Sequence, residues 1–367
     1  MHTHPPSQNL RVLIVDDTAL YRRLLTEAVM TIPRASVVGM AVDGVTALKK
    51  LETMLVDFVV LDIEMPKLNG IETLTAIRER WPGVGVVIVS GVDDRAAELT
   101  VEALSRGALD FVPKGGADSP GENLEQLALH LRRVAMTFRT KRVADHFAWR
   151  KSSLAAPRVK APAPPTGTRV PPAIEAVALA ASTGGPQVLD DVLAQLPGDL
   201  GAPVFVVQHM PPAFTAALAR RLDAKSSLAV CEARDGQTVQ PNVVYVAPGG
   251  QHMVVRGPGS SARVGVVSAS EKDHCRPSAD VLFRSLATTF GGSVLVAVMT
   301  GMGEDGLAGV RALKHRGAYC LSQEESTCVV YGMPRAVAEA GLADEQFTPQ
   351  NLAGRLTSLV RRRPLDG

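Results

Sequence analysis

The sequence predicts an α/β protein with two doubly wound parallel sheets, one in each of two domains, joined by a proline-rich linker. Two observations carry this prediction. Short runs of Val, Ile, Leu and Ala alternate with helical patterns, and the alternation stops and restarts after a segment rich in proline. The 367 residues are enough for two domains of ordinary size. We expect a first domain at 10–128, a helical extension and linker at 129–172, and a second domain at 173–362.

The first domain contains five apolar runs with Asp, Gly or Pro at their flanks, which are typical of buried parallel strands. These runs are 10–17, 35–41, 57–62, 84–91 and 108–115. Helical patterns lie between them and give five βα repeats. After the fifth run, leucines recur at steps of three and four residues from Leu124 to Leu131. This spacing predicts a last helix with one apolar face.

The segment 151–172 has six prolines, no aromatic residue and no acidic residue, which predicts an extended, semi-rigid linker. Strand and helix patterns then resume at Ile174 and continue to about residue 362. The predicted strands of the second domain are 174–182, 202–209, 243–248, 293–301 and 318–323.

The composition excludes several classes of protein. A net charge of +2 is too small to indicate a nucleic-acid or membrane partner. No apolar run approaches 18 residues, and the N-terminal MHTHPPSQNL lacks the apolar region of a secretory signal, so we expect no membrane span. The cysteines form no C-x-x-C pair, which argues against a zinc site or a redox dithiol and favours reduced thiols in a cytoplasmic protein. They are Cys231, Cys275, Cys320 and Cys328.

Acidic residues follow two strands of the first domain. Asp16 and Asp17 come after the first strand and Asp62 after the third. The carboxyl ends of parallel strands meet at one edge of a sheet, where three carboxylates would repel one another unless a cation such as Mg²⁺ lies between them. Ser90 ends the fourth strand and Lys114 follows the fifth. Carboxylates, a cation, a hydroxyl and an ammonium are the groups that an acyl-phosphate site needs.

The segments VDD, LDIEMP, VSG and FVPKG resemble a response-regulator receiver domain over nearly all of residues 10–128. The resemblance implies a flavodoxin-like fold in which a histidine kinase of the chemotaxis type supplies the phosphoryl group to Asp62. It also implies that Ser90, Phe111 and Lys114 respond to the phosphoryl group. The implied Mg²⁺ ligands are Asp16, Asp17, Asp62 and the backbone carbonyl of Glu64.

Three polar residues follow three apolar runs of the second domain. These residues are Ser182, His209 and Asp305, and a parallel sheet would bring them to one edge. A serine hydroxyl needs a base, which His209 can provide, and Asp305 would orient the imidazole. Gly184 and Gly185 would allow a tight turn after Ser182. Backbone N–H groups near Met302 and Gly303, or at the start of the helix at 184–195, could bind the oxyanion.

Structural alternatives exist for each of these residues. Ser182 could belong to a cap and turn, His209 could be a strand-end histidine, and Asp305 could cap the helix at 307–315. The segment 301–306 also fits G-x-G-x-x-G, with Glu324 about 20 residues on, as in a dinucleotide-binding fingerprint. That interpretation leaves Ser182 and His209 unexplained.

Six segments resemble the CheB family of chemotaxis protein-glutamate methylesterases over roughly 174–360: ASTGGP, VVQHMPP, YVAPGGQHM, HCRPSADVLFRSLA, VMTGMGEDG and CVVYGMPRAV. The resemblance implies a Rossmann-like esterase domain without a cofactor, with Ser182 as nucleophile, His209 as base and Asp305 as its orienting partner. It implies hydrolysis of glutamate methyl esters on methyl-accepting chemoreceptors, and deamidation of glutamines by the same route. Glu304, Cys275 and the segment SQEEST depart from the usual family pattern.

The receiver and the esterase together predict a gated enzyme in which phosphorylation of Asp62 makes the triad available to receptor helices. The alternative from another class is a response regulator whose second domain binds a partner or a nucleotide without catalysis. A DNA-binding output is disfavoured because no basic helix-turn-helix pattern follows the linker.

Overall fold

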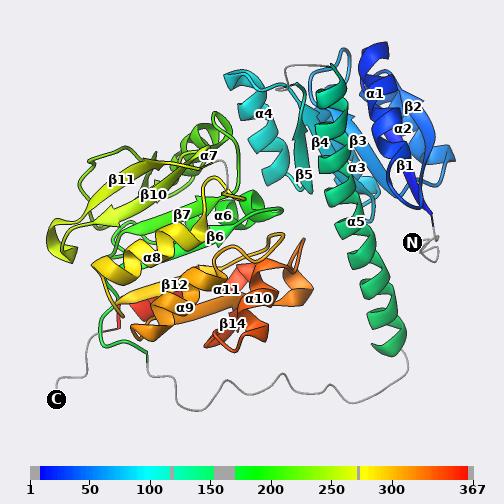
Figure 1. Ribbon diagram of the computed structural model, residues 1–367. Helices are drawn as coiled ribbons and strands as arrows, with labels where there is room; N and C mark the ends of the chain where they lie inside the picture. Colours follow the sequence, from blue (N-terminus) through cyan, green and yellow to red (C-terminus); the bar gives the residue numbers. More distant parts are fainter. Residues whose placement is uncertain (1–8, 116–119, 153–169, 271–272, 363–367) are drawn as a thin grey trace. The chain divides into compact units, whose positions relative to one another are not determined.

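The computed structural model describes residues 9–115, 120–152, 170–270 and 273–362 (Figure 1). The chain separates into two units, residues 1–160 and 161–367. Most of the predicted linker, residues 153–169, lies outside the described residues. The prediction of two α/β domains with parallel sheets is confirmed.

The first unit contains a five-stranded parallel sheet in the order β2-β1-β3-β4-β5. This order is that of a flavodoxin-like doubly wound sheet. Every predicted strand is present, shortened by up to four residues where polar residues or glycine flank the apolar run. The strands are β1 (Leu10–Val15), β2 (Ala35–Ala41), β3 (Phe58–Asp62), β4 (Gly85–Ser90) and β5 (Asp110–Pro113).

In the described part of this unit, five helices cover the sheet, and polar side chains fix where four of them begin. Thr18, Asp43, Asn69 and Asp93 each accept a hydrogen bond from a backbone N–H in the first turn of the helix that follows. The helices are α1 (Ala19–Met30), α2 (Gly44–Thr53), α3 (Gly70–Arg80), α4 (Asp94–Ser105) and α5 (Pro120–Ser152).

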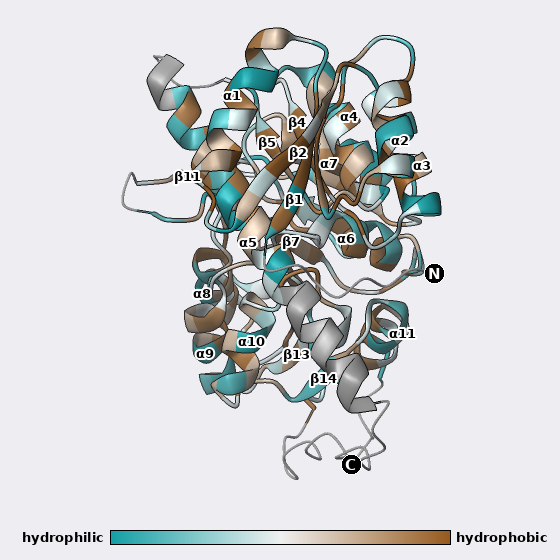
Figure 2. Cartoon of the chain, turned by 90° about the vertical axis from the view of Figure 1, so that its right-hand side faces the viewer, coloured by the Kyte–Doolittle hydropathy of each residue, from teal (hydrophilic) through white to brown (hydrophobic). Residues whose placement is uncertain are grey.

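The core of the first unit follows from the alternation of side chains along its strands. One residue in two, such as Ile14 in β1 and Val60 in β3, packs with Leu25 of α1 and with Leu127 and Leu131 of α5. The strands are accordingly coloured mostly as hydrophobic in Figure 2, while the exposed sides of helices such as α2 are hydrophilic. The predicted apolar face of the last helix is therefore the face that lies on the sheet.

The second unit contains a seven-stranded sheet in the order β14-β13-β12-β6-β7-β9-β8, with every neighbouring pair parallel. A separate antiparallel hairpin joins β10 (Gln251–Arg256) to β11 (Arg263–Ser268). The sheet strands are β6 (Ala176–Ala181), β7 (Val204–Gln208), β8 (Ala229–Glu232), β9 (Val243–Val246), β12 (Val294–Val298), β13 (Tyr319–Gln323) and β14 (Glu345–Phe347).

The strand order reverses beside β6. After β6 the chain adds strands on one side of the sheet, then crosses over and adds β12, β13 and β14 on the other side. The carboxyl ends of β6 and β12 flank the crevice where doubly wound sheets bind ligands. The helices of this unit are α6 (Gly185–Leu193), α7 (Phe214–Asp223), α8 (Ala279–Thr289), α9 (Leu307–His315), α10 (Met333–Glu339) and α11 (Pro349–Val360).

Helices α8 and α9 lie side by side on one face of this sheet (Figure 1), and a glycine allows their close approach. A Cβ atom added to Gly309 of α9 would lie 2.6 Å from Cβ of Phe283 and 3.1 Å from Cα of Asp280, both on α8. Phe283 is fully buried in the core beneath these helices. The close contact brings the starts of α8 and α9 to either side of Asp305, which accepts a hydrogen bond from Ala279 N–H.

Gly309→Ala is therefore expected to destabilise the second unit by about 1–3 kcal/mol, because the added methyl group forces the two helices apart. Gly354→Ala in α11 is the matched control, since no atom lies within 4 Å of its added Cβ. The control should stabilise the protein by about 0.5–1 kcal/mol through helix propensity alone. Urea denaturation followed by circular dichroism measures both; equal effects from the two substitutions would contradict the packing argument.

Candidate functional site

In the first unit, the predicted acidic residues lie together at the carboxyl edge of the sheet. Ligand atoms of Asp16, Asp17 and Asp62 lie within 4.8 Å of one another. Asp16 and Asp62 are buried, and Asp17 is exposed. Lys114 reaches into the same cluster, with Nζ 2.8 Å from Oδ2 of Asp16 and 2.7 Å from Oδ2 of Asp62.

This cluster has more negative than positive charge. Burial raises the pKa of Asp62 to about 6, although the hydrogen bond from Lys114 lowers it in part. Among the described residues, one ammonium therefore faces two buried carboxylates and a third, exposed one. The oxygen donors and the uncompensated negative charge fit a hard divalent cation such as Mg²⁺. The backbone N–H of Glu64 lies 3.4 Å from Oδ1 of Asp62, which places the Glu64 backbone next to these carboxylates.

Ser90 and Phe111 lie on the same face of the five-stranded sheet, because their strand neighbours Val89 and Val112 both face the α1–α5 side. The Ser90 hydroxyl is buried and donates to the backbone oxygen of Ala96 in α4 over 3.4 Å. Phe111 is half-buried in β5. The backbone N–H of Lys114 donates to Ser90 O, which ties the end of β5 to the end of β4.

In the second unit, the strand ends bring together the three residues predicted there. Ser182 follows β6, His209 follows β7, and Asp305 lies in the loop between β12 and α9. The backbone N–H of His209 donates to Ala181 O over 3.1 Å, and that of Ser182 donates to Thr300 O over 3.0 Å. The adjacent strands therefore hold the three segments in register at the crevice.

Asp305 and His209 form a close pair, with Nε2 of the imidazole 2.8 Å from Oδ2 of the carboxylate. Asp305 also accepts hydrogen bonds from the Ser278 hydroxyl and from the backbone N–H groups of Ala279 and Asp280. These donors belong to the start of α8, so the carboxylate caps that helix from another part of the chain. The structural alternative that Asp305 caps the helix at 307–315 is wrong: the N-cap position of α9 is Gly306.

The electrostatics of the pair follow from these contacts. Burial opposes the charged imidazole, but hydrogen bonds to Asp305 and Cys275 outweigh it and raise the pKa of His209 to about 9. Burial acts on Asp305 in the opposite direction, and the hydrogen bonds from His209, Ala279 and Ser278 outweigh it, so the pKa of Asp305 is lowered. The two shifts describe an ion pair that stays charged at neutral pH.

The backbone turn after Ser182 depends on its two glycines. Gly184 has a φ of 79°, and a Cβ atom there would lie 2.5 Å from Cγ2 of Val329. A Cβ at Gly185 would collide with the Gln208 side chain, which donates to Ser182 O over 2.9 Å. Within the described residues, the Ser182 hydroxyl has no hydrogen-bond partner. Asp305 takes Nε2 of His209, so a proton transfer from the serine would use Nδ1.

The backbone near Met302 and Gly303 borders Ser182. A Cβ atom added to Gly301 would lie 2.9 Å from Cβ of Ser182. Gly301 N–H donates to Val330 O, but in the described part of the chain the N–H groups of Met302 and Gly303 donate to no backbone carbonyl. Gly303 has a φ of 81° and open space on its side-chain side. Among the described residues, these two N–H groups therefore have no backbone acceptor, and they follow directly after Gly301 in the chain.

The dinucleotide interpretation of 301–306 conflicts with the contacts at the start of α9. Such a fingerprint needs the first N–H groups of the helix to receive a pyrophosphate. Here Gly309 N–H donates to Oδ1 of Asp280 over 2.6 Å, and Gly306 N–H also points to that carboxylate. A carboxylate from α8 therefore occupies the position that a phosphate would take.

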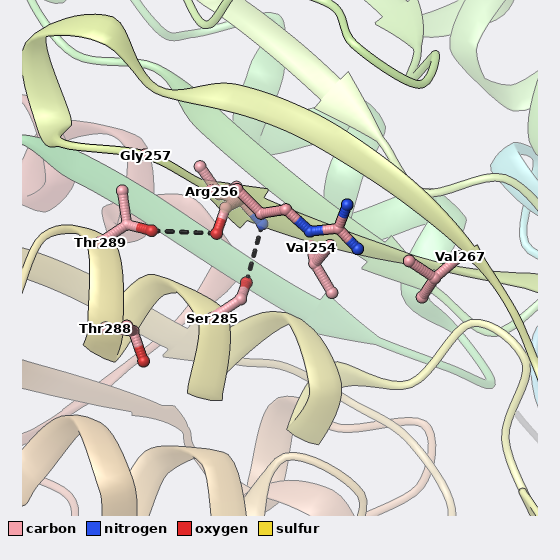
Figure 3. Close-up of a pocket in the computed structure, with 8 residues that line it drawn as sticks. Val254, Arg256, Gly257, Val267, Ser285, Thr288 and Thr289 are labelled. Atoms are coloured by element: carbon pink, nitrogen blue, oxygen red, sulfur yellow. Dashed lines mark hydrogen bonds between the residues drawn. The ribbon is translucent and has the colours of Figure 1, made fainter.

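A pocket of about 600 Å³ lies beside the β10–β11 hairpin and α8, away from these strand ends (Figure 3). Two of its polar side chains already have partners: the hydroxyls of Ser285 and Thr289 bond to the backbone N–H and C=O of Val255. None of the predicted site residues lines it. The predicted site residues of the second unit therefore lie at the strand ends and not in this pocket. Among the described helices, none is long and apolar enough to cross a membrane.

Comparison with known proteins identifies the family. Residues 177–356 match the CheB methylesterase family, and residues 12–120 match the response regulator receiver domain. A protein-glutamate methylesterase/protein-glutamine glutaminase of Desulfotalea psychrophila is 38% identical over 361 residues, covering 96% of this chain and 99% of the relative. The chain belongs to this family. A Caulobacter vibrioides member is 40% identical over 355 residues, again covering 96% of this chain and 99% of the relative.

The second unit also resembles a solved structure, the crystal structure of the Thermotoga maritima CheB methylesterase catalytic domain. The match has a TM-score of 0.50 and 37% sequence identity, and covers 51% of this chain and 100% of that chain. Membership in the methylesterase family over nearly full length removes the alternative of a response regulator with a nucleotide-binding output.

Three residues of the methylesterase domain were not predicted as part of the site. Cys275 contributes to the pKa of His209, Ser278 donates to Asp305, and Asp280 bonds to the start of α9. All three lie in HCRPSAD, where polar and titratable residues crowd directly before a helix. This concentration of polar residues is the sequence signal for their role. A search for polar residues at the ends of strands misses the segment, because it follows no strand of the sheet.

Proposed function

We propose that this chain hydrolyses the methyl esters of protein glutamates on chemoreceptors, with Ser182, His209 and Asp305 as its catalytic residues, and that phosphorylation of Asp62 increases this activity. The observation that carries the proposal is the 2.8 Å pair of His209 and Asp305 at the strand end next to Ser182. The relatives named as protein-glutamate methylesterase/protein-glutamine glutaminase support the substrate class. Deamidation of receptor glutamines by the same route is part of the proposal.

In this mechanism the hydroxyl of Ser182 attacks the ester carbonyl while Nδ1 of His209 accepts its proton. The N–H groups of Met302 and Gly303 receive the oxygen that becomes negatively charged. His209 then donates the proton to the leaving methanol, and Asp305 stabilises the imidazolium through Nε2. A water molecule, deprotonated by His209, releases the glutamate carboxylate and restores the serine.

In the receiver, Asp62 is the proposed acceptor of a phosphoryl group from a histidine kinase. Asp16, Asp17, Asp62 and the Glu64 carbonyl would hold Mg²⁺, which when bound offsets the charge on the phosphoryl oxygens. Lys114 would pair with the new phosphoryl group, which the contact of its ammonium with Asp62 supports. The Ser90 hydroxyl would exchange its 3.4 Å bond to Ala96 for a phosphoryl oxygen, and Phe111 would move on the same face of the sheet.

Ser182→Ala should lower methanol release from methylated receptor by about 10⁴-fold or more, because the nucleophile is lost. Phosphorylation of Asp62 should be unchanged in this variant, which controls for correct folding of the chain. A Ser182→Ala variant that still releases methanol at a comparable rate would reject the serine as nucleophile.

Asp62→Asn should retain basal methanol release and lose its stimulation by a phosphodonor such as acetyl phosphate, because the acceptor carboxylate is absent. The measurement is methanol release with and without acetyl phosphate in the presence of Mg²⁺. Glu64→Gln is the matched control, because only the backbone of Glu64 is proposed to act. Stimulation that survives in Asp62→Asn would contradict control through this residue.

The rate should depend on pH through His209. A base must be neutral to accept a proton, and the pKa of His209 is raised to about 9. The neutral fraction therefore increases with pH and falls about tenfold for each unit below 9. We expect kcat/KM to rise with pH up to about 9 in zinc-free buffer. A profile that is flat between pH 6 and 9 would mean that the Asp305 and Cys275 contacts do not hold the imidazole in its charged form.

A further inference from the structure

We propose that His209, Cys275 and Asp305 bind a divalent metal ion of borderline softness, Zn²⁺ in the first place, and that this ion switches the esterase off. The metal site is argued from the side chains alone. The inhibitory consequence rests on the function proposed above, because it requires His209 and Asp305 to be catalytic.

The three side chains already lie close to the spacing that a metal requires. Ligand atoms of His209, Cys275 and Asp305 are all within 4.8 Å of one another, and Nε2 of His209 is 2.8 Å from Oδ2 of Asp305. A tetrahedral zinc ion with ordinary bond lengths separates its nitrogen, oxygen and sulfur ligands by about 3.3–3.5 Å. Small movements of the side chains would therefore bring all three atoms to bonding distance of one ion.

The donors also suit this type of metal. One imidazole nitrogen, one thiolate and one carboxylate oxygen form a mixed set that favours Zn²⁺ over Mg²⁺ or Ca²⁺, which prefer oxygen ligands alone. Three protein ligands leave a fourth position open for water. The three residues are partly exposed, with 15% of the His209 side chain and 10% of that of Asp305 accessible, so an ion can enter from solvent.

Hydrogen bonds around the cluster keep its ligands in place, as the outer contacts of known metal sites do. Ser278, Ala279 and Asp280 hold the Asp305 carboxylate. The segment that carries Cys275 is held by His252, which is buried: its Nε2 lies 3.1 Å from Asp273, and its Nδ1 accepts from Ser278 N–H over 3.2 Å.

A bound ion would block catalysis directly. It would take Nε2 of His209 and the Asp305 carboxylate, release the thiol proton of Cys275, and prevent the imidazole from acting as a base. The absence of a C-x-x-C pair argued against a zinc site. That pattern does not reveal this cluster, because its three ligands are far apart along the chain and meet only in the folded sheet. The simpler interpretation is that the Cys275 thiol forms a hydrogen bond with His209 and that no metal binds. The two interpretations differ in whether the sulfur of Cys275 bonds to an ion.

The test uses the full chain with excess Mg²⁺, which occupies the acidic cluster of the receiver, and Co²⁺ as a spectroscopic probe in place of Zn²⁺. Co²⁺ bound to a thiolate absorbs in the near ultraviolet. We expect this band in the wild type and in Ser182→Ala, and its loss in Cys275→Ala. Cys231→Ala is the matched control, because Cys231 is also partly exposed but lies outside the cluster; its band should remain.

The second arm measures methanol release with increasing Zn²⁺, each variant relative to its own zinc-free rate. Cys275→Ala should need at least about tenfold more Zn²⁺ than the wild type for half inhibition, since loss of an outer contact alone costs a metal site about 10–100-fold in affinity. No thiolate band in the wild type, or equal Zn²⁺ sensitivity in both proteins, would overturn the proposal. A wild type with the band but without esterase activity would instead reject the proposed function and leave the metal site standing.

Discussion

The carboxylate of Asp305 is the contact on which the second unit depends most. It lies between the start of α8 and the imidazole of His209, and it accepts hydrogen bonds from both. This carboxylate therefore serves two purposes at once. The amide groups at the start of a helix need an acceptor, and a base in a partly buried site needs a fixed partner. The Asp305 side chain meets both needs, so the contact that holds the start of α8 also orients the imidazole of His209.

The first unit uses the opposite arrangement of charge. Its buried carboxylates, Asp16 and Asp62, share the ammonium of Lys114, and the described part of the site keeps an excess of negative charge. In the second unit the negative charge of Asp305 is balanced by an imidazole and by helix amides. The edge of the first sheet therefore favours cations, whereas the edge of the second sheet holds a pair of opposite charges. Two sheets of the same class differ in chemistry because of a few side chains at their strand ends.

The sequence predicted the central strands and the residues at their ends well, because Val- and Ile-rich runs with polar residues directly behind them leave little choice of structure. It did not predict β8, β14 or the β10–β11 hairpin. β8 and β14 have only four and three residues, and the hairpin carries Gln251, His252 and Arg256 among its apolar residues. The role of Asp305 at α8 was missed for another reason: helix α8 lies before it in sequence, and a cap from a distant segment leaves no local pattern. The contact of Cys275 with His209 likewise exists only after folding.

The order of strands in the second sheet has a consequence for synthesis. β6, which precedes Ser182, lies between β7 and β12, and β12 is made only after the hairpin and α8. A chain leaving the ribosome thus displays its serine and histidine long before the carboxylate that orients them. The three side chains can meet only after β12 has paired with β6, so this late strand is needed before Asp305 reaches His209.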